Sequence, residues 1–335
     1  MKIIAFFNNK GGVGKTSLVY HLAWTFSDLG YRVVATDLDP QANLSAMFLD
    51  EESLVEAFDA TDTARTIYHA VEPLTGVSDI SEVTLTEFGP RLSLLLGDIR
   101  LSVFEDSLSQ SWTECLGRES RPFFVVTAFF RVLRSCAAEA EAEVVLVDVG
   151  PNLGAINRAA LIAADHIVFP VGADLFSLYG LKNLGPSLHE WREEWRQRRE
   201  YFAKKHLGQP LTLPAGTMKP TGYVTTQHSQ YSGRASQAYK RWLDRIPEAY
   251  LRDVLRDRDS AIPAFDSDDN CLARIKHYRS LMPMAQEARK PIFHLTAADG
   301  AIGAHYYAAR EGGEDFAALA RELAVRCQLA PPDQG

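Results

Sequence analysis

A glycine-rich segment at residues 9–17 combines two lysines with a threonine and a serine. Glycines let successive backbone N–H groups converge on phosphate oxygens, and a helix that begins there adds its positive dipole end. Lys15 is placed to reach β- and γ-phosphates, and the Thr16 hydroxyl is placed to ligate Mg²⁺. The pattern Lys-Gly-Gly-x-Gly-Lys-Thr/Ser arises by chance at about one start in 10⁷. It therefore predicts a phosphate-binding loop rather than a flexible turn.

Two residues of this segment depart from an ordinary phosphate loop. Asn9 stands where the usual pattern opens with glycine, which is a mild change because asparagine tolerates the left-handed region. Lys10 is a second lysine that phosphate binding does not require. The residues alone leave two readings of Lys10 open, a solvated surface lysine or a second functional cation.

Three carboxylates follow predicted strands. Asp37 and Asp39 end the second strand beside the phosphate loop, where they could orient a water molecule or contact Mg²⁺ through water. For either of them alone, a strand-end turn is an alternative interpretation. Asp148 ends the apolar run 144–147, which has the Walker B form, and in P-loop enzymes that carboxylate holds Mg²⁺.

Short apolar runs rich in β-branched and aromatic residues recur along the chain and predict strands. They cover residues 3–7, 32–36, 92–96, 144–147, 166–171, 222–225 and 292–295. Helical patterns lie between most of them, and the first helix should begin at Lys15 and end at Gly30, which suits the left-handed position after a helix. Such alternation predicts an α/β fold with a doubly wound, mostly parallel sheet of the P-loop NTPase kind.

The 335 residues, of which 46% are hydrophobic, can bury a sizeable core, and no low-complexity linker divides them. We expect a single domain over residues 1–330, with elaborations at about 50–90 and 191–219. In the second elaboration the charges of both signs at 192–205 favour a solvated helix face. The expected packing stripe of that helix is Leu181, Leu184, Leu188, Trp191 and Trp195.

Composition excludes several classes of protein. The net charge of −8 argues against a protein that coats nucleic acid, so any such contact needs a local basic patch. No apolar run reaches the roughly 18 residues of a membrane span, and the N-terminus does not resemble a signal peptide. The four cysteines are far apart and lack a C-x-x-C pair, so disulfide and zinc frameworks are poorly supported. The expected location is the cytoplasm.

Residues 10–16 resemble the deviant Walker A motif of the ParA/MinD family. The resemblance implies that Lys10 crosses the interface of an ATP-bound homodimer to touch the partner's nucleotide. Residues 37–41 resemble the family's Walker A′ motif, which gives Asp39 the role of positioning water. Residues 148–151 resemble its Asp-x-Pro-Pro Walker B motif, with Gly150 replacing a proline.

The predicted site combines these motifs. Nucleotide contacts are expected from Lys10, Gly11, Gly12, Val13, Gly14, Lys15, Thr16, Ser17, Thr226 and Gln227. Catalytic roles are expected for Lys10, Lys15 and Asp39, and Mg²⁺ ligation for Thr16, Asp39 and Asp148. Adenine is implied by the resemblance, since Thr226-Gln227 does not form the Asn-Lys-x-Asp guanine signature.

The resemblance extends to about Cys327 and is nearest to the Soj-like ParA proteins. Segments that recur in ParA order are 66–68, 95–98, 169–171, 178–181, 222–226 and 288–292. The chain begins at its first strand, so we expect no N-terminal helix-turn-helix and no site-specific operator binding. Residues 314–329 predict a packed terminal helix rather than the basic amphipathic anchor of MinD.

The resemblance implies an ATPase that dimerises with ATP and Mg²⁺, binds DNA nonspecifically and is released by slow hydrolysis. A ParB-like or cargo-adaptor protein would stimulate that hydrolysis. Surface cations of an acidic protein are an equally good reading of the DNA candidates, which are Arg274, Lys276, Arg279, Arg289 and Lys290. An ATP-gated regulatory or assembly switch without DNA is the alternative function. A metabolic ligase or kinase would need an acceptor site for which the sequence has no motif.

Overall fold

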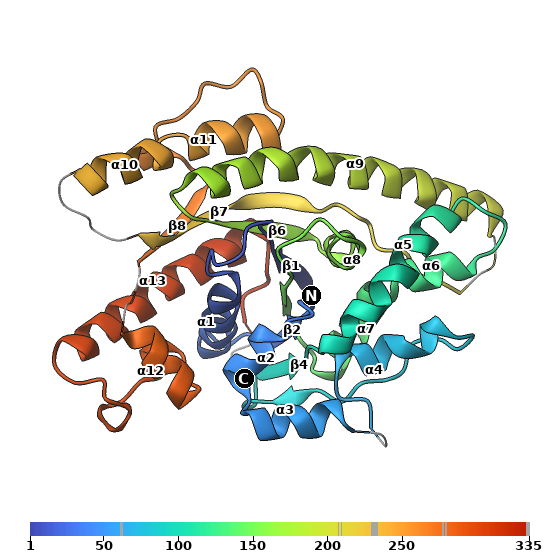
Figure 1. Cartoon of the computed structure of the whole chain (residues 1–335), viewed down its shortest axis with the longest axis horizontal. Helices are drawn as coiled ribbons and strands as arrows, with labels where there is room; N and C mark the ends of the chain where they lie inside the picture. Colours follow the sequence, from blue (N-terminus) through green and yellow to red (C-terminus); the bar gives the residue numbers. More distant parts are fainter. Residues whose placement is uncertain are drawn as a thin grey trace.

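The structure is a computed structural model that describes residues 1–60, 63–206, 208, 210–228, 234–276, 278 and 280–332. In this part of the chain, eight strands form one sheet in the order β3-β4-β2-β5-β1-β6-β7-β8. Helices cover both faces of the sheet (Figure 1). Every strand pair is parallel except β3 with β4. The prediction of a doubly wound, mostly parallel α/β fold is confirmed.

The strands are β1 (Lys2–Phe6), β2 (Val33–Asp37), β3 (Thr86–Glu87), β4 (Leu92–Leu95), β5 (Val144–Asp148), β6 (His166–Val171), β7 (Lys219–His228) and β8 (Cys271–Lys276). The α-helices of the first half are α1 (Lys15–Asp28), α2 (Asn43–Phe48), α3 (Glu51–Phe58), α4 (Ile67–Val71), α5 (Phe104–Glu114), α6 (Arg121–Val126), α7 (Ala128–Glu139) and α8 (Ala155–Ala163). Those of the second half are α9 (Leu175–Lys205), α10 (Arg234–Leu243), α11 (Ile246–Ala249), α12 (Leu281–Ala288) and α13 (Ala304–Arg326). Short 3₁₀-helices are η1 (Glu72–Thr75), η2 (Ile99–Val103), η4 (Phe265–Ser267), η5 (Ile292–His294) and η6 (Ala297–Asp299), and η3 (Tyr250–Val254) is a π-helix.

The central strand β1 contributes to a core on each side of the sheet, because successive side chains of a strand point to opposite faces. Ile3 and Ala5 pack into the layer that includes α5, α7, α8 and α9. Ile4 and Phe6 pack into the layer that includes α1, α12 and α13. Burial on both faces explains why these strands read as continuous apolar runs.

Helix α1 begins and ends as predicted. Its N-cap, Gly14, has φ 77°, and Gly30 follows the C-terminus with φ 97°. Both values lie in the left-handed region, which glycine adopts without a Cβ penalty. The helix can therefore start directly against the phosphate loop and stop sharply before β2.

Two features of the sheet differ from the prediction. The expected strand at 292–295 is wrong, because these residues form η5, where the Ile292 N–H donates to His21 Nε2 (3.2 Å) instead of joining the sheet. Strand β8 was not predicted, since as an edge strand it mixes buried Leu272 and Ile275 with exposed Arg274. Edge strands often carry such charges, which weaken the apolar pattern.

The predicted packing stripe of α9 is confirmed, since all five of its residues are buried. The solvated face predicted for the charged run is wrong at Arg198, which is only 7% exposed. Its guanidinium lies 4.0 Å from the ring centre of Trp112, and its Nε donates to the Trp112 carbonyl (2.9 Å). Arg192 is half-buried and donates to the Met218 carbonyl (2.7 Å). Trp112 of α5 thus stabilises the Arg198 guanidinium, which the sequence pattern had placed on a solvent-exposed helix face.

The terminal helix is packed, as predicted. Phe316, Leu319 and Leu323 of α13 are buried in the layer that contains α1. Within the described residues, none of the helices has the length and apolar character needed to cross a bilayer.

Candidate nucleotide-binding site

The functional side chains meet at the carboxyl edge of the sheet. Asp148 at the end of β5 lies beside Asp37 at the end of β2 on one side and beside Phe6 at the end of β1 on the other. The phosphate loop leaves β1 at this point. In open α/β sheets, ligands bind outside the carboxyl ends of the strands, so the topology brings together the motifs that sequence reasoning linked.

The phosphate loop has the backbone shape that its glycines permit. Gly12 and Gly14 have φ 74° and 77°. Asn8 is buried and holds the loop, since its Nδ2 donates to the Pro170 carbonyl (2.7 Å) and its Oδ1 accepts from the Lys10 N–H (2.9 Å). The Thr226 hydroxyl donates to the Val13 carbonyl (2.6 Å). Thr226 therefore fixes the loop, and the side chain of Gln227 lies outside the described residues.

Lys15 stands at the first position of α1 and is almost fully buried. Burial lowers its pKa, while the negative charges of Asp148 and Asp39 act in the opposite direction. Its place at the start of α1, directly after the glycine-rich loop, suits contact with β- and γ-phosphate oxygens.

Asp148 is fully buried, and neither of its carboxylate oxygens has a hydrogen bond of good geometry among the described residues, although the Thr16 side chain and the Val149 N–H are close enough to lower its pKa. Burial raises its pKa to about 6, although Thr16 and the Lys15 charge counteract the shift. An orphaned buried carboxylate is costly, so its presence indicates a missing ligand. The residues present fit a Mg²⁺ ion held through Thr16 and Asp148.

Asp37 and Asp39 occupy different environments although they are two residues apart. Asp37 is fully buried, and its Oδ2 accepts from both the Ser45 N–H (2.8 Å) and the Ser45 hydroxyl (2.9 Å). Burial, assisted by the charge of Asp148, raises its pKa to about 8. Asp39 lines the cavity above the phosphate loop. Of the two, Asp39 is the one that lines the cavity, with 6% of its surface exposed, and Asp37 is enclosed and bonded to Ser45.

That cavity measures about 560 Å³. Asp39 and Pro151 line it, together with six loop and helix residues of the predicted site: Gly11, Gly12, Gly14, Lys15, Thr16 and Ser17. Among the described residues, no group of three or more His, Cys, Asp or Glu side chains could hold a metal. Mg²⁺ characteristically takes only one or two protein ligands plus phosphate oxygens.

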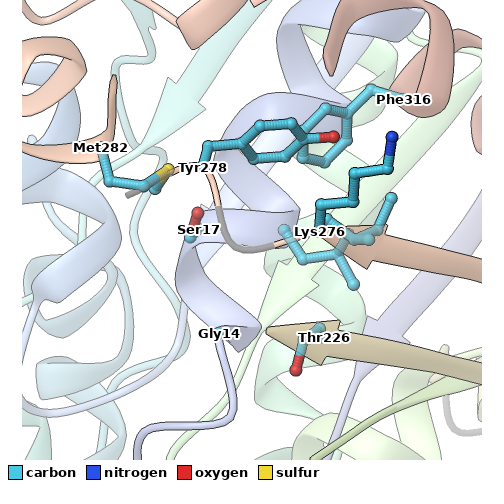
Figure 2. A pocket seen from close by; sticks show the side chains of 9 residues that line it. Gly14, Ser17, Thr226, Lys276, Tyr278, Met282 and Phe316 are labelled. Carbon is cyan, nitrogen blue, oxygen red and sulfur yellow. The ribbon is translucent and has the colours of Figure 1, made fainter. Parts of the chain in front are cut away.

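A smaller apolar pocket of about 120 Å³ adjoins the loop (Figure 2). Ser17 and Thr226 lie at its base, and Tyr278, Met282 and Phe316 lie around it. Aromatic and thioether side chains suit the flat face of a purine. Ser17, a predicted nucleotide contact, thus lines a pocket in which a base could pack. The apolar residues that form the wall of this pocket were not predicted from the sequence.

The loop after Walker B has Gly150 in place of the first proline of the Asp-x-Pro-Pro motif, and hydrogen bonds hold it. Buried Asn157 donates through Nδ2 to the carbonyls of Gly150 and Asn152, each at 2.7 Å. A Cβ at Gly150 would lie 3.3 Å from Asp39 Oδ1. Glycine at this position therefore leaves room for the catalytic candidate, and Asn157 supplies the rigidity that proline would have given.

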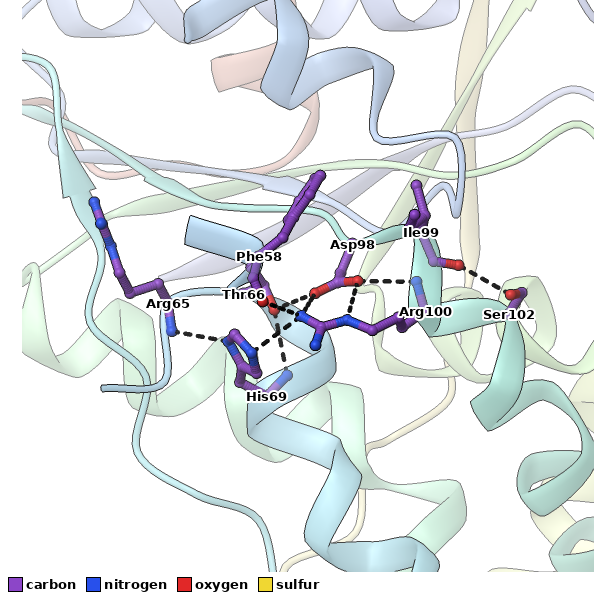
Figure 3. Close-up of polar contacts among 8 residues, drawn as sticks. All are labelled: Phe58, Arg65, Thr66, His69, Asp98, Ile99, Arg100 and Ser102. Atoms are coloured by element: carbon purple, nitrogen blue, oxygen red, sulfur yellow. Dashed lines mark hydrogen bonds and ion pairs between the residues drawn. The ribbon is translucent and has the colours of Figure 1, made fainter. Parts of the chain in front are cut away.

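A polar network supports the site from the β4 side (Figure 3). Asp98 is buried and accepts from the Thr66 hydroxyl (2.8 Å) and from Arg100 Nη2 (2.6 Å). The same Nη2 donates to the Phe58 carbonyl (2.7 Å), which joins η2 to α3. The adjacent Gly97 N–H donates to the Ser45 hydroxyl (2.8 Å). The first elaboration is thus connected to the Walker A′ segment through Ser45.

Lys10 does not point to a phosphate position of its own chain. Its Nζ lies 2.5 Å from Asp174 Oδ2, at the start of α9. Both side chains are partly exposed. Neither reading from the sequence, a solvated lysine or a contact across a dimer, included this ion pair.

Exposed apolar side chains surround the same edge. They follow the carboxyl ends of β4, β5 and β6, and Phe176 is 70% exposed. The set is Ile99, Val103, Leu153, Leu175, Phe176 and Tyr179. Several large exposed apolar groups around one edge are typical of an interaction surface.

The DNA candidates are less favourably placed. Three of them form ion pairs with carboxylates: Arg274–Asp266 (2.7 Å), Lys276–Glu311 and Lys290–Asp299 (2.8 Å). Arg289 follows α12 in the left-handed region, and Arg279 lies outside the described residues. Three of the four described candidates, Arg274, Lys276 and Lys290, therefore present little uncompensated charge to a phosphate backbone.

Sequence reasoning missed four site residues that act through tertiary contacts, namely Asn8, Ser45, Asn157 and Asp174. Asn8 directly precedes the predicted loop segment 9–17. Asn157 follows the Walker B aspartate by nine positions, and this proximity is its only signal in the sequence. Ser45 and Asp174 carry no local signal.

Comparisons with known proteins agree with this geometry. A family model described as "AAA domain" matches residues 1–200. The sporulation initiation inhibitor protein Soj of Bacillus subtilis is 31% identical over 183 residues, which cover 55% of this chain and 63% of Soj. The chain spans about half the length of other curated relatives that it matches.

Two solved structures have the same fold. Protein DIP2308 from Corynebacterium diphtheriae has 27% identity and a TM-score of 0.63, with 86% of this chain and 97% of that chain covered. A plasmid partition protein from Borrelia burgdorferi, bound to AMPPNP, has 19% identity and a TM-score of 0.53, with 92% and 97% covered. The chain belongs to the AAA domain family, and within it to the ParA/MinD-type P-loop ATPases.

Proposed function

We propose that this protein is an ATPase that dimerises with ATP and Mg²⁺, binds DNA nonspecifically in that state, and segregates or positions a plasmid, chromosome or protein cargo. The observation that carries the nucleotide part is the meeting of the phosphate loop with Asp39 and the orphaned Asp148 at one sheet edge. The functional unit would be one domain over residues 1–330, with elaborations at about 50–90 and 191–219, acting in the cytoplasm.

Each residue has a separate task in the proposed hydrolysis. Backbone N–H groups of residues 10–16 bind phosphate, and Lys15 neutralises the β- and γ-phosphate charge. Thr16 and Asp148 would hold Mg²⁺, with Asp39 contacting it through water, and the ion would neutralise charge that develops on the phosphate oxygens. Asp39 orients the attacking water. Ser17 and the apolar pocket beside it would receive the base.

Dimerisation is supported by the apolar side chains around the nucleotide edge. Phe176 and Tyr179 stand at the start of α9, next to the ion pair of Lys10. Two such edges facing each other would bury this surface and exclude water from the site. Lys10 would then contact the nucleotide of the other subunit. A ParB-like or cargo-adaptor protein would stimulate hydrolysis.

A second candidate is an ATP-gated regulatory or assembly switch that acts on protein partners without DNA. The pairing of Arg274, Lys276 and Lys290 with carboxylates favours it, since those charges are already compensated. The two candidates share the nucleotide site and the dimer, and they differ only in the matrix that the ATP state binds.

The test combines light scattering with sedimentation of duplex DNA in ATP and in ADP. The main candidate expects an ATP-dependent dimer that sediments with DNA of any sequence. The second expects the same dimer without DNA. The control is Lys15→Ala, which should lose nucleotide binding and every downstream response. A wild-type chain that remains monomeric in ATP would rule out both.

A further inference from the structure

The ion pair between Lys10 and Asp174 joins the phosphate loop to α9 within one chain. Lys10 Nζ lies 2.5 Å from Asp174 Oδ2, and their side chains are 31% and 37% exposed. The residues are separated by 164 positions in sequence. The contact is therefore a tertiary one, formed where the start of α9 meets the phosphate loop.

Asp174 is held in place by its own helix. It is the N-cap of α9, where its Oδ1 accepts from the Ser177 N–H (3.0 Å) and its Oδ2 accepts from the Ser177 hydroxyl (3.1 Å). Burial raises the pKa of Asp174, but the bonds from Lys10 and Ser177 outweigh this and lower it overall. A fixed, ionised carboxylate thus faces Lys10.

The phosphate loop is also close to α9 at a second point. A Cβ at Gly180 would lie 2.6 Å from Asn9 Oδ1, so the helix backbone approaches the residue before Lys10. Lys10 is consequently beside α9 because of packing, and the ion pair then fixes the direction of its side chain.

We propose that Asp174 is a positioning residue that holds Lys10 within its own subunit before dimerisation and must release it when Lys10 reaches the partner's nucleotide. The inference rests on the proposed dimer, because only there does Lys10 act across an interface. A phosphate of another subunit would compete with Asp174 for the same ammonium group.

The ion pair should therefore oppose dimerisation reversibly. Partly exposed ion pairs are weak, so a phosphate can displace the carboxylate. Two subunits release two such pairs per dimer. Removing the pair should lower the protein concentration needed for half-maximal dimerisation in ATP by about threefold to tenfold.

Asp174→Asn removes the negative charge but keeps the helix cap, because asparagine caps helices as well as aspartate does. Asp174→Glu retains the charge and should behave more like the wild type. Glu190→Gln is the matched control, since it removes one exposed carboxylate from the same helix. Dimerisation would be followed by light scattering across protein concentrations at saturating ATP.

A second readout uses the nucleotide-free chain. The rate of Lys10 acetylation by a small reagent, measured by mass spectrometry, should rise in Asp174→Asn and not in Glu190→Gln. A merely structural cap would leave that rate unchanged.

The outcomes separate the inference from the proposed function. If wild type dimerises but Asp174→Asn dimerises no better, or worse, the role of Asp174 is overturned and the dimer stands. Unchanged Lys10 acetylation in that variant also overturns it. If wild type stays monomeric in ATP, the proposed function fails and the inference fails with it.

Discussion

At the scale of single residues, Asp37 and Asp39 lie in different environments although they are only two positions apart in the sequence. Asp37 is enclosed by Ser45 and held away from solvent, whereas Asp39 lines the cavity. The difference comes from the backbone, because β2 ends at Asp37 and Asp39 lies in the turn that follows the strand. Asp39 is therefore the one of the two that our proposal makes catalytic.

Replacing Asp39 by asparagine should leave ATP affinity within about threefold of wild type, because the phosphate loop is untouched. Turnover should fall at least about 100-fold, since a positioned carboxylate that assists proton transfer contributes roughly 10² to 10⁴ in rate. Fluorescent-nucleotide titration and phosphate release would measure the two quantities. Turnover equal to wild type would remove Asp39 from the mechanism.

At the scale of elements, α1 links the phosphate loop to the C-terminal layer. His21 is fully buried, lies stacked on Phe316 with ring centres 4.7 Å apart, and accepts the Ile292 N–H at Nε2. Its Nδ1 lies 2.6 Å from the Ser17 carbonyl, which requires a proton on Nδ1. A second proton could be added only by breaking the bond from Ile292.

This histidine predicts an acid-sensitive contribution to stability. Burial lowers the pKa of His21 from 6.5 to about 4, so the folded state binds fewer protons than the unfolded state between these values. The contribution is complete above pH 6.5 and is lost as pH falls toward 4. From pH 7.5 to 5 the loss should be about 2 kcal/mol.

Urea unfolding of wild type and His21→Gln at several pH values would test this. The stability difference between the two proteins should shrink by about 2 kcal/mol from pH 7.5 to 5. Replacing exposed His189 by glutamine is the control and should not change the pH dependence. A constant difference would show that His21 can be protonated in the folded protein without cost.

The contact between α9 and η3 gives a second prediction at this scale. A Cβ at Gly185 would lie 1.9 Å from the Asp253 carbonyl oxygen, and neither backbone can move independently. Gly185→Ala should therefore destabilise the protein by about 3 kcal/mol, the upper end for overpacking. Asn183→Ala on the exposed face of α9 should change stability little. Equal denaturation midpoints for the two variants would contradict the packing.

At the scale of the whole molecule, charge limits what the protein can bind. The chain has a net charge of −8, and three of its candidate DNA contacts are already paired with carboxylates. DNA binding must therefore compete with these internal pairs as well as with salt. A dimer would double the number of contacts that a monomer can make.

If the ATP dimer binds DNA through about three to four contacts per subunit, the slope of log affinity against log salt should be near −6. Glu311→Gln frees Lys276 and should strengthen binding of every sequence alike. Glu190→Gln alters net charge equally and should have a smaller effect. Salt titrations of the three proteins in ATP would measure this, and weaker or unchanged binding by Glu311→Gln would exclude Lys276 as a contact.

The parts predicted from the sequence are those with local causes. The strands β1, β2, β5 and β6 are buried on both faces, so their apolar runs are continuous. The phosphate loop is a local arrangement of glycines before a helix. By contrast, β8 has a mixed pattern because it is an edge strand, and residues 292–295 gave a strand pattern although tertiary contacts fold them into η5.

The rest of the site depends on distant contacts. Asp174 meets Lys10 across 164 positions, and Gly97 meets Ser45 across 52. Hydrophobic periodicity and local propensity depend only on neighbouring residues, so they cannot predict contacts between such distant positions. Arg198 shows the same limit, because the helix pattern assigns it to solvent, while the aromatic ring that buries it belongs to α5.

The length of α9 has a mechanical consequence. Its 31 residues extend about 46 Å, and Gly185 lies where the helix is pressed against η3. That contact divides the helix into arms of about 15 Å toward Asp174 and about 30 Å toward Lys205. If α9 rotated as a rigid body about this contact, a shift of about 1 Å at the Asp174 end would become about 2 Å at the Lys205 end. Release of Lys10 could thereby be read out at a surface far from the nucleotide.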